Sequence, residues 1–197
     1  MNPPPFEYGK TYHIYNRGNN HELLFRNQHD YNLFTKRMTK YLTPTCHIYA
    51  FCLLPNHFHM LIQFKEGKEL PILYQLGRNK IHRPFTQLFT SYVMIFNKRY
   101  NRSGSLFQEH LRRKVIPDES YFRQALLYIH LNPAKHLDYS TISSYPYSSY
   151  RLYLNPDLPC QIEKSFPIQL FDDLENFIYC HKQAQNLLLE EASVLEN

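Results

Sequence analysis

The chain has 197 residues, which is enough for one domain of ordinary size with a substantial core, and its formal net charge is +5. No stretch approaches about 18 consecutive apolar residues, which excludes a membrane-spanning helix. Basic side chains gather between residues 78 and 114, whereas acids outnumber them after residue 155. A basic centre among many tyrosines suits a polyanion whose bases stack on aromatic rings, although basic surfaces are also common on proteins that bind no nucleic acid.

The N-terminal residues 1–10 are rich in proline and predict an extended arm. They contain neither the basic region nor the apolar region of a secretory signal. Cys46, Cys52, Cys160 and Cys180 include no C-x-x-C pair, so we expect reduced, mostly buried thiols and no zinc site or disulfide. We therefore expect a bacterial cytoplasmic protein, associated with the nucleoid.

The first two thirds of the chain alternate between strand and helix patterns. Period-two or continuous apolar runs predict four strands, at residues 11–15, 46–54, 57–64 and 111–116. Helical spacing predicts two helices, at residues 28–42 and 75–100, the second broken near Arg83-Pro84, with a turn at 16–18 and loops at 19–27 and 65–70. This βαββαβ order predicts a ferredoxin-like α+β fold, an antiparallel sheet with helices on one face.

A third helix is predicted to begin at Pro117-Asp118 and to end at Asn132-Pro133, because the proline ring disfavours continued helix. Residues 138–154 are rich in serine and tyrosine and predict a turn and a short helix. An amphipathic helix is expected within 167–189, either packed on the domain or docking a partner. We therefore divide the chain into a domain at 1–154 and a C-terminal helical extension at 155–197.

Two histidines stand two residues apart in the strand predicted at 57–64. Residues two apart on a strand point to the same face, so His57 and His59 are expected side by side while Phe58 and Met60 enter the core. Two neutral imidazoles held this way can bind one divalent metal ion. The alternative is a pair of half-buried histidines without a ligand, so further groups are needed to distinguish the two.

Tyr128 and Asn132 are four residues apart on the third helix, hence on one face and one turn apart. A tyrosine hydroxyl can attack a phosphodiester and later leave again, since its pKa is about 10. A divalent ion held by His57 and His59 would neutralise the phosphate, and the amide oxygen of Asn132 is a suitable third ligand. Alternatively, Tyr128 is a core aromatic and Asn132 an ordinary helix end.

Several motifs together resemble one family. His57-Phe58-His59 resembles the HUH motif of single-tyrosine endonucleases, in which U is a bulky apolar residue. The segment 128–133, YIHLNP, resembles the tyrosine motif of the REP-associated tyrosine transposases, relatives of the single-tyrosine insertion-sequence transposases. Further likenesses, in the family's order, are the segments 15–18 (YNRG), 96–100 (FNKRY), 104–108 (GSLFQ) and 147–150 (YSSY). The resemblance covers residues 8–150 and leaves out those after about 155.

The resemblance implies a ferredoxin-like fold that binds single-stranded DNA folded into hairpins, as a monomer or homodimer. It also implies cleavage dependent on Mg²⁺ or Mn²⁺, with a 5′-phosphotyrosine link at Tyr128 and a free 3′-OH. Strand transfer reverses this step without ATP. In the family the two histidines and a polar residue four after the tyrosine hold the metal, which carries over to His57, His59 and Asn132. The type of the third ligand varies in the family.

Basic residues supply the expected DNA contacts. The candidates are Arg17, Lys98, Arg99, Arg102, Arg112 and Arg113. Tyr121, two turns before Tyr128 on a similar face, is a candidate second nucleophile. Two other functions stay open from the sequence: a hairpin-binding protein that does not cleave, and a metal-dependent hydrolase of small phosphates, against which the basic, tyrosine-rich surface argues.

Overall fold

The protein is described by a computed structural model that covers residues 4–137, 141–155, 157–158 and 162–195. The described strands form one sheet: β1 (Thr11–Arg17), β2 (Cys46–Leu54), β3 (His57–Phe64) and β4 (Arg112–Val115). Their order in the sheet is β2-β3-β1-β4, and every neighbouring pair is antiparallel. This is the order in which a βαββαβ chain builds a ferredoxin-like sheet, so the predicted fold class is confirmed.

The described helices fall into three groups along the chain. Before β4 lie η1 (Asn19–His21), α1 (Gln28–Leu42), η2 (Gly67–Glu69), α2 (Ile72–Gln75) and α3 (Arg83–Arg99). After β4 comes α4 (Glu119–His136), and the remaining helices are η3 (Ile142–Ser144), α5 (Tyr150–Leu154), α6 (Ser165–Leu170) and α7 (Leu174–Leu195). None of the helices in the described ranges is long and apolar enough to cross a membrane.

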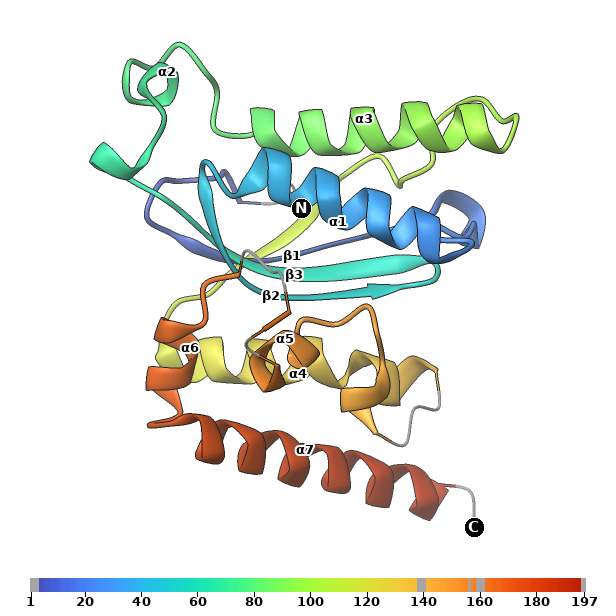
Figure 1. The fold of residues 1–197 in the computed structure, drawn as a ribbon, viewed down its shortest axis with the longest axis vertical. Helices are drawn as coiled ribbons and strands as arrows, with labels where there is room; N and C mark the ends of the chain where they lie inside the picture. Colours follow the sequence, from blue (N-terminus) through green and yellow to red (C-terminus); the bar gives the residue numbers. More distant parts are fainter. Residues whose placement is uncertain (1–3, 138–140, 156, 159–161, 196–197) are drawn as a thin grey trace.

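The sheet separates two helical layers, with α1 and α3 on one side and α4 to α7 on the other (Figure 1). Each side of the sheet has its own core, because side chains alternate between the two faces of every strand. On β3, Phe58 and Met60 enter the core under α1 and α3, as predicted, and Ile62 joins them. Leu61 belongs to the core under α4, on the face to which His57 and His59 also point. The histidine pair therefore lies between the sheet and α4.

Three predicted boundaries differ from the structure. The first strand continues through Asn16 to Arg17, where a turn was expected, because both residues pair with β3. The predicted break near Arg83-Pro84 is the first turn of α3, where a proline costs no helical hydrogen bond. Residues 165–195 form α6 and α7, with Asp172 between them at a φ of 69°.

The helix α4 runs past Pro133 to His136, so the predicted end at Asn132-Pro133 is wrong. Proline removes one helical hydrogen bond but need not end a helix whose other contacts hold it. Pro133 and Asn132 are buried against the rest of the molecule, and Leu137 still donates to the Pro133 carbonyl at 3.0 Å. The additional turn places His136 on the same helical face as Tyr128 and Asn132.

The C-terminal helix α7 packs on α4 (Figure 1), and whether it also docks a partner stays a prediction. Three buried polar groups join the helices to the edge of the sheet. His181 donates through Nδ1 to the Phe177 carbonyl at 2.7 Å and lies 2.8 Å through Nε2 from Nδ1 of His130. Nε2 of His130 lies 2.8 Å from the Ser149 hydroxyl. The boundary at residues 154 and 155 itself stays a prediction.

Two smaller predictions lie partly outside the described residues. Cys46 and Cys52 are buried free thiols, whereas Cys160 is not among the described residues. Of the N-terminal arm, residues 4–7 have no regular secondary structure, and Phe6 packs on the rings of Tyr12 and Phe64. Residues 1–3 and 138–140 are likewise not described.

Candidate active site

The two predicted histidines lie side by side at the start of β3. Their ring centroids are 5.4 Å apart, and the rings are nearly perpendicular. His57 donates through Nδ1 to the Asn56 side-chain oxygen at 2.7 Å. Nδ1 of His59 lies 2.9 Å from Nε2 of His13. Both Nδ1 atoms are therefore engaged, whereas neither Nε2 has a hydrogen-bond partner among the described residues, so both can serve a ligand.

His13 and Tyr15, on the neighbouring strand β1, complete a cluster of rings around His59. Tyr15 is the register partner of His59, and the two rings stack at 5.6 Å. His13 lies two residues before Tyr15, so it points to the same face of the sheet, and its ring centroid is 5.1 Å from that of His59. These neighbours fix the orientation of His59 from two sides.

Tyr128 reaches this cluster from α4, on the other side of a groove. Its ring meets His59 edge to face, with centroids 5.5 Å apart, and lies 5.7 Å from the ring of His13. The side chain is 40% exposed, so the phenol is accessible from solvent while its ring packs on two imidazoles. Tyr128 is thus a surface residue facing the histidines, and the alternative of a core aromatic does not hold.

Asn132 lies one turn after Tyr128 and is almost fully buried. Its side-chain nitrogen donates to the Tyr128 carbonyl at 2.7 Å, which fixes the orientation of the amide. The side-chain oxygen is buried, and no hydrogen-bond partner is found for it among the described residues. A buried amide oxygen without a partner is costly unless a ligand satisfies it.

These donors fit the divalent ion that the family resemblance implies. Two imidazole nitrogens and one amide oxygen are ligands that Mn²⁺ accepts, and hard oxygen ligands suit Mg²⁺. Within the described part of the chain, no three His, Cys, Asp or Glu side chains are arranged to hold a metal ion. The set to test is therefore His57, His59 and Asn132, in which the third ligand is an amide.

His136, on the added turn of α4, lies beside His57. Their ring centroids are 5.1 Å apart at 90°. Tyr128, Asn132 and His136 follow one another at intervals of four residues, so they form one stripe along the helix. Tyr128 therefore lies against His13 and His59, and His136, two turns later on the same helix, lies against His57.

The environment of the histidines keeps them neutral. Burial, with smaller contributions from His136 and Arg17, lowers the pKa of His57 to about 4. Burial and the neighbouring His13 lower the pKa of His59 to about 2, and burial lowers that of His13 to about 4. Neutral imidazoles offer lone pairs, which is the state that metal binding requires.

The motif at residues 15–18 has a structural role at the edge of the site. A Cβ on Gly18 would lie 2.0 Å from the Glu22 carbonyl oxygen, so no other residue fits there without moving the chain. The Gly18 amide donates to the Asn56 carbonyl at 2.8 Å, and Asn16 donates to the Gln108 carbonyl at 3.1 Å. The motif thus joins β1 to the turn before His57 and to the segment at 104–108.

Three cations line the groove near the tyrosine and histidines. Arg17 and Arg112 border a small pocket with His57 and His59, and both are exposed. Lys114 is the register partner of His13 and borders a cleft next to Tyr128. No ion pair with an acid is found for these three within the described residues. Their charge is therefore available to a phosphate backbone.

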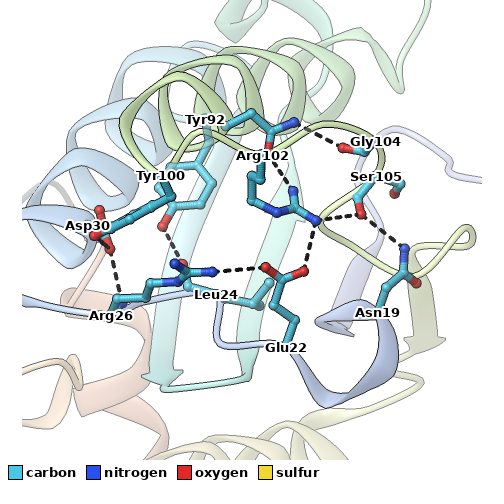
Figure 2. A network of polar contacts seen from close by, with 11 residues as sticks. Asn19, Glu22, Leu24, Arg26, Asp30, Tyr92, Tyr100, Arg102, Gly104 and Ser105 are labelled. Carbon is cyan, nitrogen blue, oxygen red and sulfur yellow. Dashed lines mark hydrogen bonds and ion pairs between the residues drawn. The ribbon is translucent and has the colours of Figure 1, made fainter.

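Two other predicted DNA contacts, Arg99 and Arg102, are paired with acidic side chains. Arg99 pairs with the buried Asp30 at 2.6 Å. Arg102 pairs with Glu22 at 2.8 Å and donates to Asn97, in a polar network that joins the end of α3 to the loop before α1 (Figure 2). This network lies in the helical layer across the sheet from α4, and a role for Arg99 and Arg102 in binding DNA stays a prediction.

The last two candidates also lie apart from the tyrosine. Arg113 points to the face opposite to Lys114, where its guanidinium lies 4.2 Å from the ring of Phe6 and donates to the Pro4 carbonyl. Lys98 is exposed on the last turn of α3. Of the six predicted cations, the structure places Arg17 and Arg112 beside the histidine pair. Contact with DNA remains a prediction for all six.

Four residues of the groove were missed by the sequence analysis. They are His13, Tyr15, Lys114 and His136. A local signal existed for the first two, because the alternation of the first strand already places them on one face. The positions of Lys114 and His136 depend on strand register and on the continuation of α4 past a proline.

No protein-family model matches the sequence. A curated protein of Haemophilus influenzae (strain ATCC 51907 / DSM 11121 / KW20 / Rd), named "Putative REP-associated tyrosine transposase", is 31% identical over 114 residues. The match covers 54% of this chain and 62% of that protein, so the chain spans less than two thirds of the relative's length.

A solved structure of a REP-associated tyrosine transposase bound to a REP hairpin has a similar fold, with a TM-score of 0.60. The superposition covers 84% of this chain and 93% of that chain at 18% identity, which is evidence for the fold. The resemblance inferred from the motifs is confirmed: over about half of its length this chain is similar in sequence to a protein named "Putative REP-associated tyrosine transposase", and over most of its length it is similar in fold to a solved one.

Proposed function

We propose that this chain binds single-stranded DNA folded into hairpins and cleaves it through a covalent link to Tyr128, with a divalent metal ion at His57, His59 and Asn132. The observation that carries the proposal is the place of Tyr128. Its accessible phenol stands 5.5 Å, ring to ring, from His59, and one turn from the unpartnered oxygen of Asn132. The proposed nucleophile and the proposed ligand His59 border the same groove, which supports the proposal.

The proposed reaction exchanges one phosphate ester bond for another. The Tyr128 oxygen, having lost its proton to solvent, attacks the phosphorus, and a phosphotyrosine bond forms as the bond to the 3′ oxygen breaks. The 3′ oxygen takes up a proton and leaves as a hydroxyl. When bound, Mg²⁺ or Mn²⁺ would neutralise charge on the phosphate oxygens. Attack by a 3′-hydroxyl reverses the step, which transfers the strand without ATP.

The residues of the chain hold the reacting groups in place. The contacts of Tyr128 with His13 and His59 restrict the phenol ring, and the hydrogen bond of Asn132 fixes its amide. Such positioning increases the reaction rate, because reacting groups that are already oriented lose less entropy on reaching the transition state. Arg17, Arg112 and Lys114 would contact the phosphates on either side of the linkage.

Hairpin DNA is proposed as the substrate because the solved relative is described as bound to a REP hairpin. The net charge of +5 and the exposed cations of the groove favour a polyanion. Affinity for DNA is therefore expected to fall with salt, with a logarithmic slope set by the number of phosphates that these cations neutralise.

A covalent-adduct assay tests the proposal. Labelled hairpin DNA incubated with the full chain and Mn²⁺ should give a band that resists denaturant, and Tyr128→Phe should abolish it while binding the same hairpin equally well. Tyr179→Phe is a matched control, since Tyr179 is an exposed tyrosine on α7. Removal of Mn²⁺ with chelator should also abolish the adduct.

Two results would overturn the cleavage mechanism. An adduct of undiminished intensity in Tyr128→Phe would place the nucleophile elsewhere. Specific hairpin binding without any adduct, over a range of hairpins and with either metal ion, would instead support the hairpin-binding protein that does not cleave.

A further inference from the structure

A cleft of about 450 Å³ continues the groove from Tyr128 on the side away from His57. Tyr121, Gln124 and Tyr128 border it from α4, and Tyr15 and Lys114 border it from the sheet. Its volume is within the range of small-molecule sites, roughly 300–1,000 Å³. His13 and His59 also border the cleft, next to Tyr128, whereas Tyr121 and Gln124 have no part in the proposed phosphotyrosine chemistry or in the proposed metal set.

The cleft begins at His59 and Tyr128 and extends away from the other two proposed metal ligands, His57 and Asn132, neither of which borders it. Along α4, Tyr121 and Gln124 precede the tyrosine, whereas Asn132 and His136 follow it. The sheet has the same order, because Lys114 is paired with His13 at one end of β1 and His57 with Arg17 at the other. A DNA linkage bound at Tyr128 must therefore direct one neighbouring nucleotide toward the cleft.

The walls of the cleft suit a nucleobase. The rings of Tyr121 and Tyr128 are 38% and 40% exposed, so aromatic faces are accessible to a ligand. Bases of every kind stack on such rings, and this stacking is a main source of affinity for single strands. Gln124 offers an amide that both donates and accepts, and Lys114 offers a positive charge for a phosphate.

We propose that this cleft binds the unpaired base next to the cleaved linkage, with Tyr121 stacking on the base, Gln124 hydrogen-bonding to its edge and Lys114 contacting the adjacent phosphate. This inference rests on the proposed function, because Tyr128 defines which linkage is cleaved. The proposal assigns Tyr121 to substrate binding through its ring. As a second nucleophile, Tyr121 would instead need its hydroxyl, which stacking does not use.

Two variants of Tyr121, to Phe and to Ala, distinguish base stacking from nucleophilic attack. Tyr121→Phe keeps the ring and removes the hydroxyl, so it should keep the contribution of stacking to hairpin affinity and should still form the adduct. Tyr121→Ala removes the ring and should weaken binding by about tenfold or more. Both variants should fold, because Tyr121 is exposed near the start of α4.

The decisive experiment measures binding of hairpin DNA in which an abasic site is moved, one position at a time, through the unpaired flank. Wild type should lose about tenfold or more in affinity at one position, and Tyr121→Ala should lose nothing further at that same position. Lys114→Ala should weaken all oligonucleotides alike and reduce the salt slope by about one. Gln124→Ala should reduce the preference among bases at the sensitive position only.

The scan uses equilibrium binding, so it is independent of cleavage. Equal losses in wild type and Tyr121→Ala at every abasic position would overturn the base subsite, even where the adduct at Tyr128 forms normally. Loss of the adduct in Tyr121→Phe would assign the hydroxyl a chemical role and would also overturn it. Absence of an adduct with any DNA would refute the cleavage mechanism, and the abasic scan would still test the cleft because it measures binding.

Discussion

Nε2 of His13 and Nδ1 of His59 lie 2.9 Å apart across the neighbouring strands β1 and β3. A hydrogen bond between two neutral imidazoles needs one donor and one acceptor. If His59 offers a lone pair on Nε2, its Nδ1 carries the proton and donates it to His13. His13 then positions a metal ligand without touching the metal, in the way that partners of metal-binding histidines commonly do.

The first prediction concerns this pair. His13→Ala removes the acceptor, so Mn²⁺ affinity should fall about 10- to 100-fold, whereas His13→Gln keeps an acceptor and should lose less. This affinity is measured by titrating the DNA-free protein with Mn²⁺ and monitoring free Mn²⁺ by electron paramagnetic resonance. The nitrogen chemical shifts of His59 should show the Nδ1-protonated form in wild type and a mixture in His13→Ala. Unchanged Mn²⁺ affinity in both variants would exclude a positioning role.

The second prediction concerns the unpartnered oxygen of Asn132. Asn132→Ala should weaken Mn²⁺ binding about tenfold, because one of three donors is lost, while hairpin binding in chelator stays unchanged. Asn132→Asp keeps an oxygen ligand and adds charge, so it should retain Mn²⁺ binding although it can no longer donate to the Tyr128 carbonyl. Calorimetric titration with Mn²⁺ measures both. Equal loss in the two variants would mean that Asn132 acts by holding the helix.

The third prediction is a loss of stability in acid. Burial lowers the pKa of His181 to about 4 and that of His130 well below its ordinary value. Below about pH 6.5 the unfolded chain binds protons that the folded chain does not, so stability falls as the pH falls from about 6.5 toward 4. Each such histidine contributes up to about 1.4 kcal/mol per pH unit.

Urea unfolding at pH 7, 6 and 5 measures this slope. His181→Gln keeps an acceptor for His130 and cannot be protonated, so the slope should decrease by up to about 1.4 kcal/mol per pH unit. The remaining slope comes from His130 and from the groove histidines, whose pKa values are also lowered. A slope identical to that of wild type would show that His181 does not contribute.

The fourth prediction concerns the polar network at the end of α3. Asp30 is fully buried and accepts hydrogen bonds from Arg99 at 2.6 Å, from the Tyr100 hydroxyl at 2.7 Å and from the Arg26 amide at 3.0 Å. Asp30→Ala should cost about 2–3 kcal/mol of unfolding free energy, less than a fully buried pair because Arg99 is partly exposed.

Chemical denaturation at pH 7 measures that loss, with Lys98→Ala as a surface control expected within about 0.5 kcal/mol of wild type. Arg99→Ala should lower stability in the same way and affect hairpin affinity less than Arg112→Ala, because the charge of Arg99 is already paired. A larger effect of Arg99→Ala than of Arg112→Ala on affinity would favour the original assignment of Arg99 to DNA binding.

Local spacing in the sequence was sufficient to predict much of this protein. The period of two on β3 places His57 and His59 on one face, and the spacing of four on α4 places Tyr128 beside Asn132, because both periods are properties of the backbone. The strands and the first helix were found for the same reason. The order of these elements then restricted the fold to few topologies, and the motifs indicated the family.

Tertiary structure decided what local spacing cannot. His13 and Lys114 enter the groove through strand pairing with residues far along the chain, and His136 through the continuation of α4 past Pro133. Arg99 and Arg102 meet the acids Asp30 and Glu22 from distant segments. Strand register and the pairing of distant charged residues depend on which surfaces are buried together. The free energy of that burial is a property of the whole fold and not of any single stretch of sequence.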